Sequence, residues 1–89
     1  MRKIPVGVLG ATGMVGQQYL RLLADHPWFE VNFLASSELS AGKTYAEAVD
    51  GRWRMMEQLP PRLWNMTIKG MDELSHAKKS CRLVFSAVG

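Results

Sequence analysis

Length, composition and charge exclude several classes of protein. The chain has 89 residues, which suits one small domain and is too short for a two-domain enzyme. Hydrophobic residues make up 47% of the sequence and include three Trp and three Phe, so a disordered chain is disfavoured. The net charge of +3 comes from scattered cations, and no nucleic-acid partner is expected. A single Cys, with neither a signal peptide nor a long apolar run, leads us to expect a cytoplasmic protein without a membrane partner.

The N-terminal residues predict a buried strand followed by a helix. Residues 4–9, "IPVGVL", form an almost continuous apolar run, as in a strand that is buried on both faces of a parallel sheet. Over residues 14–24 the apolar side chains recur at helical spacing, and Pro27 lies just beyond the end of this pattern. The apolar stripe of the helix is expected to consist of Val15, Tyr19, Leu22 and Leu23.

A second strand is predicted over residues 29–35, "FEVNFLA". Phe29, Val31 and Phe33 alternate with polar residues, so we expect these three side chains on one face of the strand. A strand, a helix and a strand in this order form a βαβ unit, whose strands are parallel and whose crossover is right-handed. The sequence therefore predicts the α/β class, as a Rossmann-type dinucleotide-binding domain over residues 1–89 with an incomplete parallel sheet.

The remaining sequence is less regular. Residues 36–43, "SSELSAGK", predict a polar loop, and residues 44–64 show no clean period. Beyond them we expect a brief strand over residues 65–70 and a short helix over residues 71–79. A final buried strand is expected over residues 82–89.

Three glycines lie between the first predicted strand and the helix, in the stretch "VGVLGATGMVG". In the turn of a βαβ unit, Gly10 would permit the tight turn, Gly13 would let a pyrophosphate approach the main chain, and Gly16 would allow close helix packing. The start of the helix adds unpaired N–H groups and the positive end of the helix dipole. Because the spacing is G-x-x-G-x-x-G rather than G-x-G-x-x-G, glycines that serve only turn geometry and packing are the alternative.

The residues after the second strand indicate which dinucleotide is bound. An Asp or Glu about 20 residues beyond the glycines would bind the ribose 2′-hydroxyl and repel a 2′-phosphate. This chain has Ser36 and Ser37 before Glu38, and Lys43 adds a positive charge. We therefore predict NADP in preference to NAD. The alternative is a solvated connection without a binding role.

The N-terminal half of the chain resembles a known enzyme family. Residues 3–45, with "GATGMVG" and "ASSELSAGK", closely resemble the N-terminus of aspartate-semialdehyde dehydrogenases of the archaeal and fungal type. The segment "LVFSAVG" resembles the fourth strand of the same domain, whereas residues 46–82 carry no such resemblance. Members of this family reduce aspartyl phosphate to the semialdehyde with NADPH, through a thioester on a cysteine, in the biosynthesis of lysine, threonine and methionine.

The resemblance implies positions for the cofactor. The residues it places against the pyrophosphate are Thr12, Gly13, Met14 and Val15. It places Ser37 and Ser40 near the 2′-phosphate, where family members often carry an arginine between the serines and this chain has Leu39. The preference for NADP is therefore expected to be modest. With the glycines included, the candidate cofactor-binding residues are Gly10, Thr12, Gly13, Met14, Val15, Gly16, Ser36, Ser37 and Ser40.

The resemblance also implies that catalysis needs residues beyond this chain. The family's nucleophilic cysteine, catalytic histidine and substrate-binding arginines lie further along, in a second domain, so we assign no catalytic and no metal-binding residue and expect the isolated chain to be inactive. Cys81 precedes a buried strand and is expected to be structural. A small-molecule substrate would bind only with the second domain, and an unpaired sheet edge would allow a homo-oligomer. Two alternatives stay open: a truncated, non-catalytic nucleotide-binding or interaction module, and a dehydrogenase of the N-acetylglutamyl-phosphate reductase type.

Overall fold

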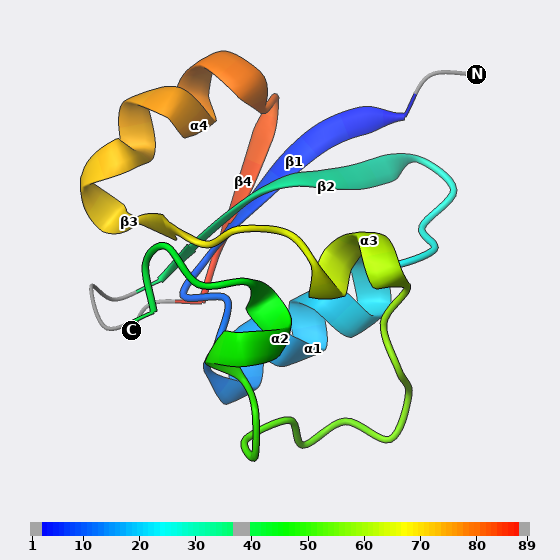
Figure 1. The fold of residues 1–89 in the computed structure, drawn as a ribbon. Helices are drawn as coiled ribbons and strands as arrows, with labels where there is room; N and C mark the ends of the chain where they lie inside the picture. Colours follow the sequence, from blue (N-terminus) through cyan, green and yellow to red (C-terminus); the bar gives the residue numbers. More distant parts are fainter. Residues whose placement is uncertain (1–2, 37–39, 88–89) are drawn as a thin grey trace.

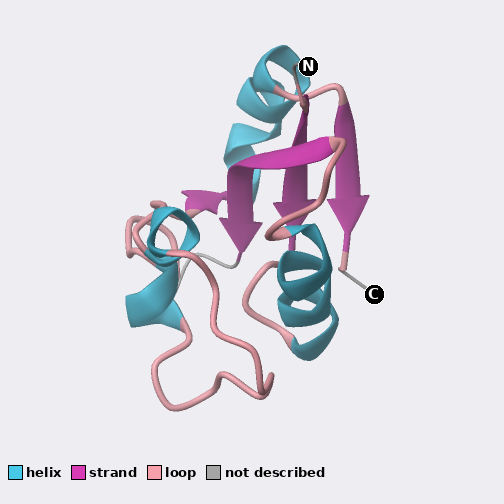
Figure 2. Cartoon of the chain, turned by 90° about the vertical axis from the view of Figure 1, so that its right-hand side faces the viewer, coloured by secondary structure: helices cyan, strands magenta, loops and turns pink. Residues whose placement is uncertain are grey.

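The computed structural model describes residues 3–36 and 40–87, which form a four-stranded parallel sheet with helices on both faces (Figure 1). The elements in chain order are β1 (Ile4–Leu9), α1 (Met14–Leu23), β2 (Phe29–Ser36), α2 (Tyr45–Ala48), α3 (Pro61–Trp64), β3 (Lys69–Gly70), the 3-10 helix η1 (Met71–Glu73), α4 (Leu74–Ser80) and β4 (Leu83–Ser86). The strand order is β3-β2-β1-β4, and each neighbouring pair is parallel. The longer strands run in one direction side by side (Figure 2). The predicted α/β class is confirmed, as are the three predicted N-terminal elements.

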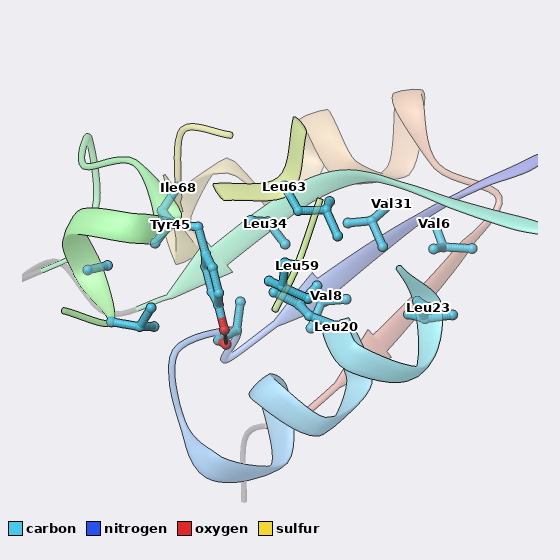
Figure 3. Close-up of a cluster of buried hydrophobic side chains, with 13 residues drawn as sticks. Val6, Val8, Leu20, Leu23, Val31, Leu34, Tyr45, Leu59, Leu63 and Ile68 are labelled. Atoms are coloured by element: carbon cyan, nitrogen blue, oxygen red, sulfur yellow. Dashed lines mark hydrogen bonds between the residues drawn. The ribbon is translucent and has the colours of Figure 1, made fainter. Parts of the chain in front are cut away.

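The two faces of the sheet carry separate cores. One face is covered by α1, α2 and α3, and α4 covers the other (Figure 1). The larger core lies under α1 to α3, where Val6 and Val8 of β1 and Leu20 of α1 are fully buried (Figure 3). The smaller core joins β2 to α4 and includes Phe33 and Cys81. Because β1 is covered on both faces, its nearly continuous apolar sequence is explained as predicted.

A register shift in β2 overturns one expectation. Val6 pairs with Val31, but the next residue, Gly7, pairs with Phe33, so Asn32 is passed over as an irregularity of the β-bulge kind. An extra residue reverses the alternation of side chains beyond it. Val31 therefore packs in the larger core and Phe33 in the smaller one, on the opposite face. The prediction that both lie on one face with Phe29 is wrong from Phe33 onward.

The buried face of α1 also differs from the predicted stripe. The buried residues of the helix are Gly16, Gln17, Leu20 and Leu23. Val15 and Leu22 are exposed, and Tyr19 is only partly buried. The apolar periodicity missed this face because two of its positions are a glycine, which allows close approach, and a glutamine, which is buried by hydrogen bonding.

The final strand is present, but it is exposed rather than buried. Within the part of the chain that the structure describes, β4 lies at an edge of the sheet and pairs only with β1. Leu83 and Val84 are 46% and 40% exposed. The apolar sequence of this segment predicted a strand correctly, but it cannot show whether neighbours cover the strand on both sides.

The stretch without a clear period forms two short helices. Thr44 caps α2: its hydroxyl accepts a hydrogen bond from the Glu47 N–H, and the Glu47 carboxylate accepts one from the Thr44 N–H. The pattern T-x-x-E was therefore a readable start signal that periodicity alone overlooks. In α3, Pro61 occupies the first turn, and the Arg62 guanidinium donates two hydrogen bonds to the Val31 carbonyl, at 2.8 and 2.7 Å.

Over residues 3–36 and 40–87, no helix combines the length and the apolar character that crossing a membrane requires.

Candidate functional site

The predicted glycine turn lies at the point where the sheet changes direction. From β1 the chain passes through α1 to β2 on one side, and it later returns through α4 to β4 on the other side of β1. In open parallel sheets, ligands bind at such a switch point, in the crevice beyond the carboxyl ends of the strands. The turn that starts at Gly10 leaves β1 at this place, next to Ala87, whose N–H donates to the Leu9 carbonyl at 2.9 Å.

Hydrogen bonds from three segments fix the backbone of the turn. The N–H groups of Gly10 and Ala11 both donate to the Ala35 carbonyl, at 2.9 and 3.1 Å. The Tyr45 hydroxyl donates to the Ala11 carbonyl at 2.7 Å, and Gln17 Nε2 donates to the Thr12 carbonyl at 3.0 Å. Two carbonyls of the turn are thus bound by side chains of α1 and α2, which constrain its backbone.

The three glycines have three different environments. Gly10 has φ 70°, which a glycine adopts without strain. A Cβ on Gly16 would overlap the Gly10 carbonyl and lie 2.7 Å from Ala11 backbone atoms, so this position needs a glycine for close packing of α1. A Cβ on Gly13 would meet nothing closer than the Gly10 oxygen at 3.9 Å. Gly13 therefore borders open space, which a side chain would fill and a phosphate could occupy.

The start of α1 faces this open space. The N-cap is Gly13, and no side chain caps the helix. The N–H groups of Met14, Val15 and Gly16 lie in the first turn and have no acceptor within the helix. Together with the positive end of the helix dipole, these donors suit an anion. Met14 and Val15 are 55% and 53% exposed, so a ligand can reach the backbone there.

The serine side of the candidate site is only partly described. Thr12 Oγ1 and Ser36 Oγ share a hydrogen bond of 2.8 Å, which joins the glycine turn to the carboxyl end of β2. Ser36 and Ser40 are both 5% exposed, and the Ser40 carbonyl accepts a bond from the Lys43 N–H. The predicted contact at Ser37 lies outside the described residues, as do Glu38 and Leu39.

Tyr45 supports the turn, although no sequence pattern indicated this role. Its side chain is fully buried, and it packs among the residues of the larger core (Figure 3). Burial raises the pKa of the Tyr45 phenol far above its ordinary value, so the hydroxyl remains a neutral donor to the Ala11 carbonyl. This contact spans 34 positions of sequence, which local patterns cannot predict.

A second wall of the site comes from the segment after α2, which sequence reasoning also missed. A cavity of about 230 Å³ borders the turn and is lined by Thr12, Gly13, Met14, Gln17, Arg52 and Arg54. Gln17 links the two walls, because its amide bonds both to the Thr12 carbonyl and to the backbone of residues 52 and 54. A larger cavity of about 430 Å³, lined in part by Trp53 and Trp64, contains none of the predicted cofactor residues.

The residues that could be mistaken for catalytic groups have structural environments. Cys81 is buried in the core between β2 and α4, two residues before β4 and therefore near the amino ends of the strands. His26 Nδ1 accepts hydrogen bonds from the N–H groups of Trp28 and Phe29, which shape the entry to β2. Among the described residues, no group of three His, Cys, Asp or Glu side chains could hold a metal ion.

The parallel sheet, the switch point and the uncapped helix after a glycine turn define the class of Rossmann-type nucleotide-binding domains. A family model described as "Semialdehyde dehydrogenase, NAD binding domain" matches residues 5–89. The chain belongs to this family of semialdehyde dehydrogenase NAD-binding domains.

Similar proteins agree with this assignment. The chain is 45% identical over 83 residues to an aspartate-semialdehyde dehydrogenase of Archaeoglobus fulgidus, a match that covers 93% of this chain and 23% of the relative. It is 41% identical over 71 residues to a malonyl CoA reductase (NADP) of Metallosphaera sedula, covering 80% of this chain and 19% of the relative. The crystal structure of aspartate semialdehyde dehydrogenase with NADP from Candida albicans matches with a TM-score of 0.88 and 36% identity, over 99% of this chain and 24% of that chain. The resemblance to aspartate-semialdehyde dehydrogenases is confirmed, and the chain spans 19 to 24% of the length of these three proteins.

Proposed function

We propose that this chain binds NADP and is the cofactor-binding part of an NADPH-dependent aspartate-semialdehyde dehydrogenase. The observation that carries the proposal is the open space at Gly13, beside the uncapped first turn of α1. A pyrophosphate in this space would accept hydrogen bonds from the free N–H groups of Met14 and Val15. The residues present therefore fit the group that the family name implies.

Each candidate residue has a defined part in this proposal. Gly10 and Gly16 bring the turn and the helix together, and Gly13 leaves room for the phosphates. Ser36 lies at the carboxyl end of β2, where the ribose of the adenosine would lie, and Thr12 connects it to the turn. Ser37 and Ser40 are proposed to lie near the 2′-phosphate. Because the turn is hydrogen-bonded on its inner side, little ordering accompanies binding.

The reaction is proposed for the longer protein of which such a domain forms a part. When bound, the nicotinamide supplies the hydride that reduces the acyl group. The residues of this chain hold and orient the cofactor, and the nucleophile and the substrate-binding groups are proposed to come from a further domain. We name aspartyl phosphate as the substrate because the relative with 45% identity and the protein of the solved structure are both aspartate-semialdehyde dehydrogenases. A cytoplasmic location and a homo-oligomer remain predictions.

Calorimetric titration of the chain with NADP tests the binding proposal. Gly13→Val places a branched side chain in the open space, and its backbone, with φ −77°, is compatible with valine. We expect saturable binding by the unaltered chain and at least a tenfold loss in the variant, about 1.4 kcal/mol, with an unchanged circular dichroism spectrum. Equal affinities of the two proteins would remove the assignment of the turn as the phosphate site.

A further inference from the structure

The cavity beside the glycine turn has a positively charged wall that the predicted site does not include. This second wall consists of Arg52 and Arg54, which follow α2 and face Thr12, Gly13 and Met14 across a space of about 230 Å³. No carboxylate is among the residues that line this cavity in the described part of the chain. Two arginines thus border the cavity, and the positive end of α1 borders it as well.

A buried glutamine holds this wall in place. Gln17 is only 2% exposed, and each polar atom of its side chain is used. Its Nε2 donates to the Thr12 carbonyl and to the Arg52 carbonyl, both at 3.0 Å, and its Oε1 accepts from the Arg54 N–H at 2.8 Å. One side chain of α1 therefore sets the distance between the turn and the backbone of the arginines.

The two arginines differ in what their side chains contact. Arg52 Nη2 donates to the Ala48 carbonyl at 2.5 Å, which directs this guanidinium back toward α2. Arg54 is exposed, and its guanidinium makes no hydrogen bond or ion pair with any residue that the structure describes. An anion in this cavity would interact favourably both with the positive charge of Arg54 and with the positive end of α1.

We propose that Arg54 binds a phosphate group of the dinucleotide and that Gln17 is its positioning residue. The inference rests on the proposed function, since it assigns a further contact within the same site. The Arg54 guanidinium would donate two charge-assisted hydrogen bonds to phosphate oxygens, from the wall of the cavity opposite the first turn of α1. The phosphate belongs to the pyrophosphate or to the 2′-position of NADP, and the choice of nucleotide in the test distinguishes them.

The test is calorimetric titration of the chain and of Arg54→Gln with NADP and with NAD. Arg82→Gln is the matched control, because it removes the same charge from an exposed residue before β4, at the opposite ends of the strands. A charge-assisted contact corresponds to about a tenfold change in affinity or more. We expect such a loss in Arg54→Gln, a weaker dependence of its binding on salt, and no loss in Arg82→Gln.

The pattern of losses identifies the phosphate. A loss for both nucleotides supports a contact with the pyrophosphate, and a loss for NADP alone supports a contact with the 2′-phosphate. Unchanged affinity of Arg54→Gln for both nucleotides, with binding by the unaltered chain intact, overturns the inference and leaves the proposed function standing. Absence of any binding by the unaltered chain overturns the proposed function itself, and the inference with it.

The positioning role of Gln17 has its own readout. Gln17→Met keeps the size of the side chain and removes its three hydrogen bonds. If Gln17 acts through Arg54, the loss of affinity that this variant causes should be smaller in the Arg54→Gln background than in the unaltered chain. Equal losses in the two backgrounds would show that Gln17 supports only the glycine turn, which contradicts the positioning role.

Discussion

At the scale of single residues, the glycines of the turn are not equivalent. Gly10 is needed for a left-handed backbone, Gly16 for the approach of a helix to the turn, and Gly13 for the empty space above it. The spacing of glycines in the sequence predicts a tight turn between strand and helix, but it does not say which glycine serves which purpose. The surroundings of each Cα in the fold separate the two roles: a side chain at position 16 would meet backbone, whereas one at position 13 would enter open space.

Gly16→Ala should therefore reduce stability rather than act first on binding. The added Cβ would overlap the Gly10 carbonyl and crowd Ala11, so backbone must move, at a cost of about 1 to 3 kcal/mol. Gly13→Ala, where the new Cβ meets only open space, is the control and should change the unfolding free energy by less. Urea unfolding of both variants measures this difference. A midpoint for Gly16→Ala equal to that of the unaltered chain would contradict the close packing of α1 on the turn.

At the scale of elements, the sequence was sufficient where the signal is local. The bounds of β1 and the start of α1 were predicted closely, because a buried apolar run and helical spacing depend on neighbouring residues. The side of the sheet on which Phe33 lies was not predicted, because a bulge at Asn32 moves the following side chains to the opposite face. The α2 helix was not predicted, because four residues are too few to show helical periodicity. The capping pattern of Thr44 and Glu47 does indicate its start.

The cap of α2 makes a specific prediction about pH. The hydrogen bond from the Thr44 backbone N–H, and then the one from its side chain, lower the pKa of Glu47 below the ordinary value of 4.5. A carboxylate whose pKa is lowered by folding stabilises the fold above the ordinary pKa, and this contribution is lost as the pH falls through the lowered value. Glu47→Gln should therefore melt below the unaltered chain near neutral pH, and the difference should vanish in acid.

Thermal unfolding of both proteins across the acid range checks this expectation. The unaltered chain should lose melting temperature more steeply than Glu47→Gln below about pH 4.5. Parallel curves for the two proteins would show that the capping box contributes nothing that depends on the charge of Glu47.

At the scale of the whole molecule, the candidate site is assembled from segments that are far apart in the sequence. The turn follows β1, the serine at its side ends β2, and the arginine wall follows α2. The family and the glycine turn could be predicted from local residues, whereas the contacts of Gln17 and Tyr45 and the proposed role of Arg54 could not. Gln17 and Tyr45 reach the turn because α1 and α2 pack on the same face of the sheet.

The measurement that tests the central claim most directly is an NMR titration of the ¹⁵N-labelled chain with NADP. We expect saturable changes that are largest at the backbone amides of Met14 and Val15, because these N–H groups would bind the phosphates. Residues that line the larger cavity, such as Gln58 and Trp64, should shift little. Changes centred on Gln58 and Trp64, or no change at the first turn of α1 at saturating NADP, would contradict the proposal.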